Sequence, residues 1–183
     1  MNIKTILRRS RWLCAAITVV TLVGHSTEVV PTQKLSASTP SAQQKMVLRY
    51  FEEVLDGARV EAIDGLFLPG CAIHRPEGEL KGLPALRGML AARRANFSSF
   101  KTQVHDLIES GDRVVVRLTH KTTASGPYRF RIGTHDIRNK TMTWDAIVIF
   151  RFENGRIAEE WVSRDELGML LDVGVLQPDG REK

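Results

Sequence analysis

The stretch EEWVSRDELG, residues 159–168, carries an acid at the junction of two predicted elements. A strand-like run contains Trp161, and Asp165 follows where a helix is expected to begin. An aspartate at such a junction caps the helix by accepting hydrogen bonds from its first amides. It can also act as a general acid or base if the strand directs its side chain toward an apolar pocket. Burial there favours the protonated form of the carboxyl group near neutral pH. The two roles are compatible.

The turn before this strand predicts the face that Asp165 occupies. The Asn-Gly pair at 154–155 is favoured in two-residue hairpin turns, and such a turn sets the register of the flanking strands. Counting outward along uninterrupted strands places Val148 opposite Trp161 and Trp144 opposite Asp165. Because that face is the apolar one, Asp165 is predicted to point inward, beside two tryptophans.

Two histidines are further candidates for the chemistry. Along the segment 112–124, alternation turns the valines inward, and His120 shares their side. It is either a pocket ligand or a structural histidine at the end of a strand. His74 follows the apolar residues 71–73 and leaves the same two interpretations open. No histidine and acid stand at the spacing of metal ligands, and the sequence has no glycine-rich phosphate loop.

Periodicity divides the chain into a helical first part and a strand-rich second part. Apolar residues recur at helical spacing over 47–55 behind Ser41, a predicted N-cap, and a longer helix is expected over 83–96. A short final helix is predicted over 165–173. Strands are predicted for 99–109, 112–124, 142–152 and 156–164. Helices followed by a strand meander predict an α+β domain with a sheet wrapped over helices.

The N-terminal 26 residues are predicted to be a secretory signal peptide. A basic segment without acids precedes the uncharged apolar run Trp12–Gly24, which is too short to span a membrane comfortably. Residues 27–43 are predicted to be a flexible linker, 44–176 the domain and 177–183 a tail. The expected location is secreted or periplasmic, without a stable membrane span after processing, and an uncleaved N-terminal anchor is the alternative.

The formal charge of +5 reflects this N-terminal segment rather than the domain. Four of the chain's 26 lysines and arginines lie in the segment, and the remaining 22 are balanced by 21 acidic residues. A domain so close to neutrality shows no bias toward nucleic acid, and no nucleic-acid partner is expected.

The outer face of the predicted hairpin carries apolar side chains. Its members include Ile147, Ile149 and Val162. Exposed apolar sheet surface is usually covered by a partner, so we expect a homodimer.

Several stretches resemble the SnoaL-like polyketide cyclase family of the NTF2-like superfamily. They are GDRVVVRLT, TTASGPY, NKTMTWDAIVIFRFENGRIAEEW and DELGMLLDVGVL. The resemblance covers about residues 44–176 and implies a cone of helices in a curved, mostly antiparallel sheet. It also implies a pocket that works without metal or organic cofactor, usually in a homodimer. In the family, an aspartate at the end of the last strand is the acid/base, and Asp165 is similar in position. His74 falls where relatives often carry a pocket Asn or His.

Two functions fit these features. The first is a cofactor-independent acid/base enzyme, of the cyclase, isomerase, hydratase or hydrolase type, acting on a small apolar, polyketide-like molecule. In this enzyme Asp165 moves the proton, and His74 or His120 polarises an oxygen. The pocket walls are predicted to include Trp144, Trp161 and Tyr50. The second is an exported, non-catalytic protein that binds a small molecule in the same cone, because one fold hosts many functions.

Overall fold

The computed structural model describes residues 39–178. The predicted signal peptide, residues 27–38 of the predicted linker and residues 179–183 of the tail lie outside these residues. None of the helices in the described part combines the length and the apolar character that a membrane crossing requires.

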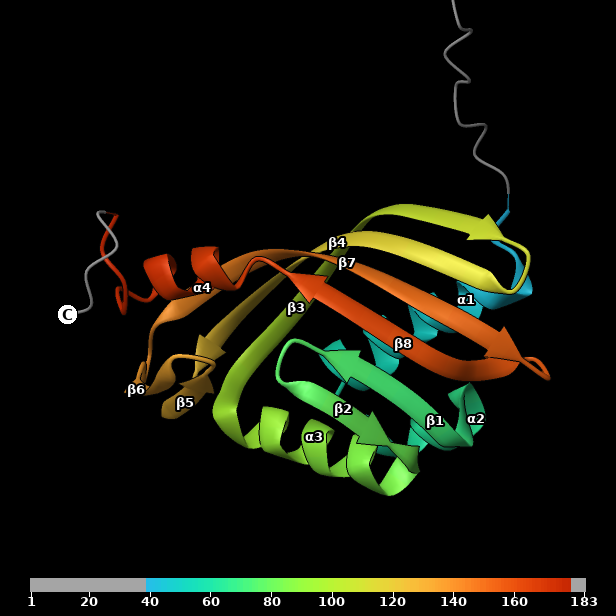
Figure 1. The fold of residues 1–183 in the computed structure, drawn as a ribbon, viewed down its shortest axis with the longest axis horizontal. Coiled ribbons are helices and arrows are strands. Elements are labelled where there is room, and N and C mark those ends of the chain that lie inside the picture. The colour runs from blue at the N-terminus through green and yellow to red at the C-terminus, as the bar shows by residue number, and fades with distance from the viewer. Residues whose placement is uncertain (1–38, 179–183) are drawn as a thin grey trace, which may run out of the picture. The chain divides into compact units, whose positions relative to one another are not determined.

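Six strands form one curved sheet with the order β2-β1-β8-β7-β4-β3 (Figure 1). The strands are β1 (Phe67–Arg75), β2 (Gly78–Lys81), β3 (Phe97–Ser110), β4 (Arg113–Ala124), β7 (Thr141–Glu153) and β8 (Arg156–Arg164). All neighbours are antiparallel except β1 and β8, which run parallel, so the predicted mostly antiparallel sheet is confirmed. A separate hairpin, β5 (Pro127–Phe130) and β6 (Gly133–Asp136), was not predicted.

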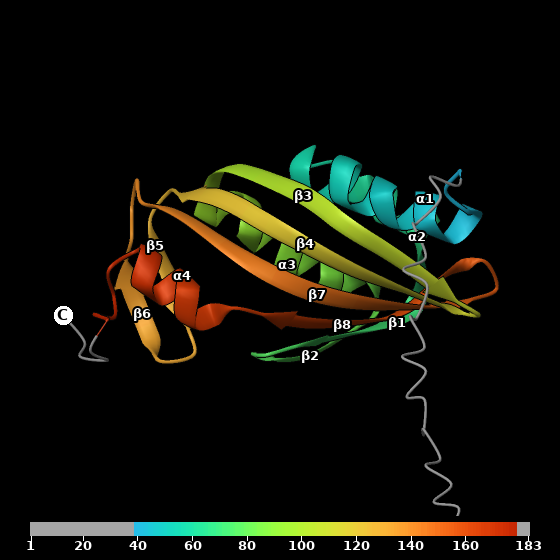
Figure 2. The same cartoon turned by 90° about the horizontal axis from the view of Figure 1, so that it is seen from above.

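The helices confirm the α+β prediction. Helix α1 (Ala42–Arg49) begins after Ser41, whose hydroxyl accepts from the Gln44 amide in a reciprocal capping box. It widens into the π-helix η1 (Tyr50–Asp56). The remaining helices are the 3₁₀ turn η2 (Val60–Ala62), α2 (Ile63–Leu66), α3 (Gly82–Asn96) and α4 (Glu166–Asp172). In Figures 1 and 2, α4 lies beside the β5–β6 hairpin at one end of the sheet.

The inner face of the sheet holds the core. Alternate residues of β4 and β7 are buried as predicted, including Val116, Leu118 and Phe150. Tyr50 meets Phe150 and Phe67 edge-on, with ring centroids 5.9 Å and 5.0 Å apart. Burial of these rings against the sheet stabilises the contact between η1 and the strands.

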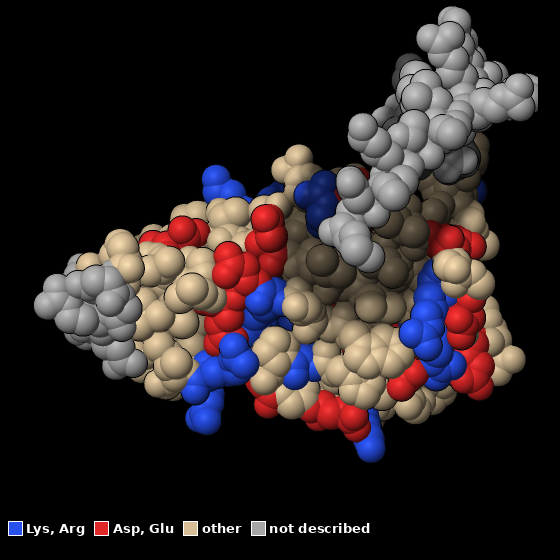
Figure 3. All heavy atoms as spheres, turned by 45° about the horizontal axis from the view of Figure 1, so that its top comes forward, with Lys and Arg blue, Asp and Glu red and all other residues tan. Residues whose placement is uncertain are grey.

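Charges on the surface of the domain are mixed in sign. On the face shown in Figure 3, acidic and basic side chains lie next to one another. Arg151, for example, contacts Glu159 at 2.6 Å and Glu153 at 3.2 Å. Solvent-accessible pairs of this kind contribute little to stability.

The turn between β7 and β8 has the predicted geometry. Asn154 and Gly155 have φ of 50° and 74°, the left-handed conformation of a two-residue hairpin turn. Phe152 pairs with Ile157, as the count from the turn requires. The predicted register is therefore correct at the turn itself.

One residue later, β8 contains a bulge. Arg151 pairs with Glu159 and Phe152 with Ile157, so Ala158 is an extra residue on β8. Ile157 and Ala158 are both buried, which departs from strict alternation. A bulge of this kind leaves one residue unpaired and reverses the facing of every side chain beyond it.

The bulge corrects three predicted placements. Trp161 pairs with Ile149 and lies on the outer face, whereas it was expected on the inner one. Arg164, which the uninterrupted count places outside, pairs with Ala146 and faces inward. Asp165 does not lie opposite a tryptophan in a pocket but is exposed at the start of α4.

Candidate functional site

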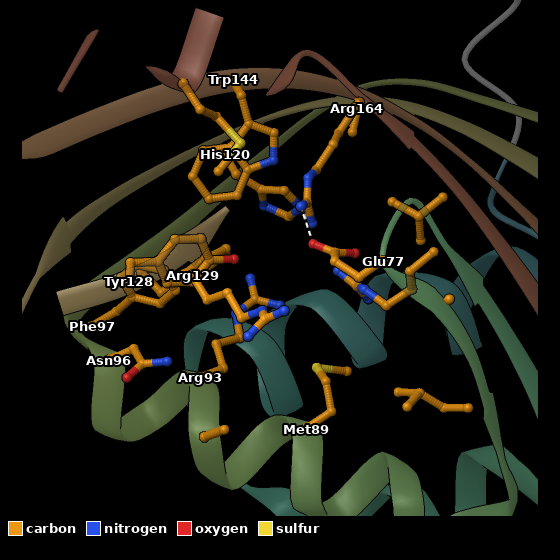
Figure 4. Close-up of a pocket in the computed structure, with 18 of the residues that line it drawn as sticks. Glu77, Met89, Arg93, Asn96, Phe97, His120, Tyr128, Arg129, Trp144 and Arg164 are labelled. Atoms are coloured by element: carbon orange, nitrogen blue, oxygen red, sulfur yellow. Dashed lines mark hydrogen bonds and ion pairs between the residues drawn. The ribbon is translucent and has the colours of Figure 1, made fainter. Parts of the chain in front are cut away.

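A cavity of about 350 Å³ lies between α3, the inner face of the sheet and the β5–β6 hairpin. Its apolar walls include Met89, Phe97, Phe100, Tyr128, Trp144 and Val162. Charged and polar side chains line it as well, among them Arg75. Figure 4 shows four others, Glu77, Arg93, His120 and Arg164. A mostly apolar hollow with a few converging polar groups is typical of a small-molecule site.

His120 is held in this cavity by three neighbouring strands. It pairs with Thr102 of β3 on one side and with Trp144 of β7 on the other. The imidazole is only 6% exposed and packs against the rings of Phe100 and Trp144, at 4.9 Å and 5.3 Å between centroids. His120 and Trp144, which were both predicted to lie at the pocket, line this cavity.

Asp56 and Thr102 determine the tautomer of His120. The Thr102 hydroxyl donates to Asp56 Oδ1 at 2.7 Å, and the Thr102 amide donates to Asp56 Oδ2 at 2.9 Å. Thr102 Oγ1 also lies 3.0 Å from His120 Nδ1. The hydroxyl has a single proton and uses it in the hydrogen bond to the carboxylate. Its oxygen therefore accepts a hydrogen bond from His120 Nδ1–H. Nε2 is therefore the ring nitrogen with a free lone pair.

The surroundings keep His120 neutral. Burial lowers the pKa of His120 to about 2, with further lowering from the positive charges of Arg93, Arg75 and Arg164. At physiological pH the ring is thus a hydrogen-bond acceptor at Nε2 and a donor at Nδ1. Within residues 39–178, no cluster of three or more His, Cys, Asp or Glu side chains is placed to hold a metal ion.

Two arginines approach the cavity from opposite walls in Figure 4, Arg93 from α3 and Arg164 from the sheet. Arg164 is 5% exposed in its side chain and forms an ion pair with Glu77. Burial opposes the charge on Glu77, but Arg164 outweighs it, and the pKa of Glu77 is lowered. The Nε atoms of Arg93 and Arg164 are buried and have no hydrogen-bond partner among the described residues.

Tyr50 lies in the core behind the cavity rather than in its wall. It is buried next to Glu160, another inward side chain of β8 beyond the bulge. Burial, followed by the negative charge of Glu160, raises the pKa of the Tyr50 phenol. Burial also raises the pKa of Glu160, although Arg75, 3.9 Å away, opposes this. Tyr50 was predicted to shape the pocket but does not line it, because its ring belongs to the buried hydrophobic core.

His74 and Trp161 lie together on the outer face of the sheet. Their rings stack with centroids 5.2 Å apart and an interplanar angle of 13°. His74 Nδ1 lies 3.1 Å from Glu79, and Nε2 lies 3.5 Å from Glu159. Both rings border a shallow hollow on this face rather than the cavity, so neither meets the substrate site that was predicted for them.

Asp165 is the N-cap of α4. Its Oδ1 accepts from the Gly168 amide at 2.8 Å, and its own amide donates to the carbonyl of Asp145 at 3.0 Å. The carboxylate is exposed and does not line the cavity. Of its two predicted roles, the structure therefore shows the cap and not the pocket location.

Two residues that line the cavity and two that support His120 were not predicted from the sequence, and one of the four had a signal. Arg93 follows Leu86, Met89 and Leu90 at helical spacing, so an arginine occupies the apolar face of α3. A charge in such a position indicates a buried functional group. The sequence shows no comparable pattern at Thr102, Asp56 or Arg164. Each of them reaches the site through hydrogen bonds or strand pairing with residues far away in the chain.

The comparisons with known proteins agree with the resemblance. A family model described as SnoaL-like polyketide cyclase matches residues 45–173. No curated protein matches the chain. Solved structures of similar fold include TsrD from Streptomyces laurentii, at 21% identity and a TM-score of 0.65, covering 76% of this chain and 100% of that one.

Two further solved structures have a similar fold. IdmH from Streptomyces antibioticus is 22% identical with a TM-score of 0.59, covering 73% of this chain and 99% of that one. An LEH-like epoxide hydrolase of M. tuberculosis is 12% identical with a TM-score of 0.58, covering 72% of this chain and 89% of that one. At these identities the likeness shows the NTF2-like fold and does not specify a reaction.

Proposed function

Because the chain belongs to the SnoaL-like polyketide cyclase family, we propose that it is a cofactor-independent enzyme that closes a ring in a small, largely apolar carbonyl compound. The observation that carries the proposal is the neutral, tautomer-locked His120 in an aromatic cavity beside arginines. An intramolecular aldol closure needs a base next to a carbonyl and a cation or donor for the developing oxyanion. The cavity offers both.

In the first step, His120 Nε2 takes a proton from the carbon beside a carbonyl. The electron pair of that C–H bond moves onto the carbonyl oxygen and gives an enolate. The imidazolium is stabilised through Nδ1–H by Thr102 and, beyond it, by the Asp56 carboxylate. Arg164 lines the cavity, and its positive charge stabilises the enolate oxygen. Because the two charges form together, the low pKa of His120 in the empty cavity is partly offset.

In the second step, the enolate carbon attacks another carbonyl of the same molecule. One C–C bond forms, and the new alkoxide takes the proton back from His120. The reaction is redox-neutral and consumes no co-reactant. The rings of Phe100 and Trp144 exclude water and favour a folded substrate, which brings the reacting carbons together.

In this proposal the acid/base role belongs to His120, whereas the sequence predicted Asp165 to move the proton and His74 or His120 to polarise an oxygen. Asp165 is engaged as a helix cap in solvent, and His74 lies on the other side of the sheet. A proton-transfer group must come within hydrogen-bonding reach of the substrate. His120 lines the cavity, whereas Asp165 and His74 do not.

Turnover of aryl-substituted 1,5-diketones that end in a methyl ketone tests the proposal, because their aldol closure gives 3-hydroxycyclohexanones, which lose water to form cyclohexenones with strong absorbance. We expect catalysed closure by the wild type and a loss of about 100-fold or more in His120→Gln. His74→Gln is the matched control and should retain turnover within about twofold. A His120→Gln variant as active as the wild type would refute the role of His120. Ligand retention without any closure would favour the non-catalytic binding protein.

We also propose that the outer face of the sheet is covered in a homodimer. Ile147 is 50% exposed there, and Ile149 and Trp161 border the same hollow. Apolar sheet surface of this kind is usually buried against a partner. A second copy of the chain is the partner that the family resemblance implies.

A further inference from the structure

Arg93 is a cation in the cavity wall without a carboxylate partner in the described part of the chain. Its neighbours differ in this respect, since Arg164 forms an ion pair with Glu77 and Arg75 lies 3.9 Å from Glu160. The Nε atom of Arg93 is buried and makes no hydrogen bond. Buried charges are normally paired, because the loss of hydration is otherwise uncompensated. The unpaired guanidinium therefore calls for an anion from outside the chain.

The lining of the cavity has an excess of positive charge. Four arginines and two glutamates contribute to it. Both carboxylates are already engaged, Glu77 with Arg164 and Glu79 with Lys81 at 2.9 Å. His120 is neutral and therefore does not change this excess of positive charge. The field inside the cavity thus favours a negatively charged ligand.

The orientation of Arg93 suits a planar anion. Its guanidinium carbon lies 3.3 Å from the centroid of the Phe100 ring, so one face of the group is covered by the aromatic side chain. Stacking leaves the edge of the guanidinium, with its N–H donors, for a ligand. A carboxylate matches that edge through two parallel hydrogen bonds.

We propose that the natural ligand carries a carboxylate, which Arg93 binds edge-on while the apolar body of the ligand packs on Trp144 and Met89. The inference takes the cavity to be the substrate site, as in the proposed function, and specifies the class of substrate as an aromatic or polyketide-like carboxylic acid. In this arrangement the carboxylate also offsets the arginine charge around His120. The ring-closing carbonyls then lie in the part of the cavity nearer His120 and Arg164.

Calorimetric titration of the full chain with 2-naphthoate and with 2-naphthamide tests the inference. The two probes have the same ring and nearly the same size, and only the first is charged. We expect the wild type to bind the carboxylate at least about tenfold more tightly, the scale of one charge-assisted hydrogen-bonded contact. Equal affinities, or no binding of 2-naphthoate at millimolar concentration, would overturn the inference.

Arginine variants identify the group responsible. Arg93→Gln, which keeps length and polarity, should reduce the preference for the carboxylate to within about twofold. Arg94→Gln is the matched control, because Arg94 is the next residue of α3, is exposed and does not line this cavity, and it should keep the preference. Arg93→Met serves as a second variant if Arg93→Gln does not fold. Retention of the full preference in a folded Arg93 variant would contradict the inference.

Because binding is measured without turnover, the two proposals fail separately. A carboxylate preference that depends on Arg93, without ring closure of any diketone, would leave the binding inference standing and remove the proposed enzyme. Ring closure that depends on His120, without a preference for the carboxylate, would leave the proposed enzyme standing and remove the binding inference.

Discussion

Thr102 and His120 face each other across β3 and β4, and Thr102 Oγ1 lies 3.0 Å from His120 Nδ1. With Asp56 behind Thr102, this contact specifies the tautomer of the histidine and leaves Nε2 as the free ring nitrogen before any ligand binds. Preorganisation of this kind lowers the cost of reaching the reactive geometry. The contact joins residues from η1, β3 and β4.

Removal of the Thr102 hydroxyl should impair the reaction more than binding. Thr102→Val keeps the branched shape that suits a strand but leaves His120 Nδ1 without its partner. We expect kcat to fall by about tenfold or more with little change in KM, and ¹⁵N NMR of the imidazole to show a mixture of tautomers. Thr102→Ser retains the hydroxyl and should behave like the wild type. If the valine variant keeps both wild-type kcat and a single tautomer, Thr102 does not position the ring.

Burial of a neutral His120 should make the protein sensitive to acid. The native pKa of about 2 lies below the value of about 6.5 in an unfolded chain, so only the unfolded state gains this proton as pH falls between them. The contribution of His120 to stability is therefore complete above about pH 6.5 and declines below it. Between pH 6 and pH 4 the decline should approach 1.4 kcal/mol per pH unit.

His120→Gln removes this proton uptake and leaves the other titrating groups in place. Urea unfolding at pH 7, 6, 5 and 4 should therefore show a steeper loss of stability in the wild type than in the variant. Parallel losses in the two proteins would mean that His120 takes up its proton in the native state as well.

Asp165 should matter for stability and not for turnover. Asp165→Ala removes the acceptor for the Gly168 amide, and we expect the free energy of unfolding to fall by about 0.5–2 kcal/mol. Asp165→Asn, which can still cap, should lose less. Both variants should retain turnover within about threefold when assayed well below their unfolding temperature. A 100-fold loss in the folded Asp165→Asn variant would restore the acid/base role to this residue.

Self-association should depend on the outer sheet face. Light scattering at micromolar concentration should give the mass of a dimer for the wild type and of a monomer for Ile147→Lys, because a charge in an apolar interface is costly to bury. Lys101→Ala, a change at another exposed position of the sheet, is the control and should remain dimeric. A monomeric wild type would end the proposal.

Features that depend on neighbouring residues could be predicted from the sequence. The N-cap at Ser41, the inward side of β4 and the hairpin turn at 154–155 all appear in the structure as expected. Local steric preferences, capping hydrogen bonds and the two-residue period of a strand are sufficient for each. The α+β class and the position of His120 on the inner face followed from the same patterns.

The site also depends on features that act over long distances in the chain. A single bulged residue, Ala158, turns Trp161 outward and brings Arg164 into the cavity. Neither local propensity nor the turn indicates it, because a bulge is stabilised by the partners that the shifted side chains find elsewhere in the fold. For Arg164 that partner is Glu77, which is 87 residues away in the chain.

The sequence by itself therefore determined the class of fold, the inner side of β4 and β7, and a histidine directed toward the core. Only the tertiary structure decided that Asp165 caps a helix in solvent, that His74 stacks on the outer face, and that Asp56 reaches His120 through Thr102. The physical reason is the range of the interactions. Alternation and capping act within a few residues, whereas register beyond a bulge and the pairing of buried polar groups are settled by the whole folded chain.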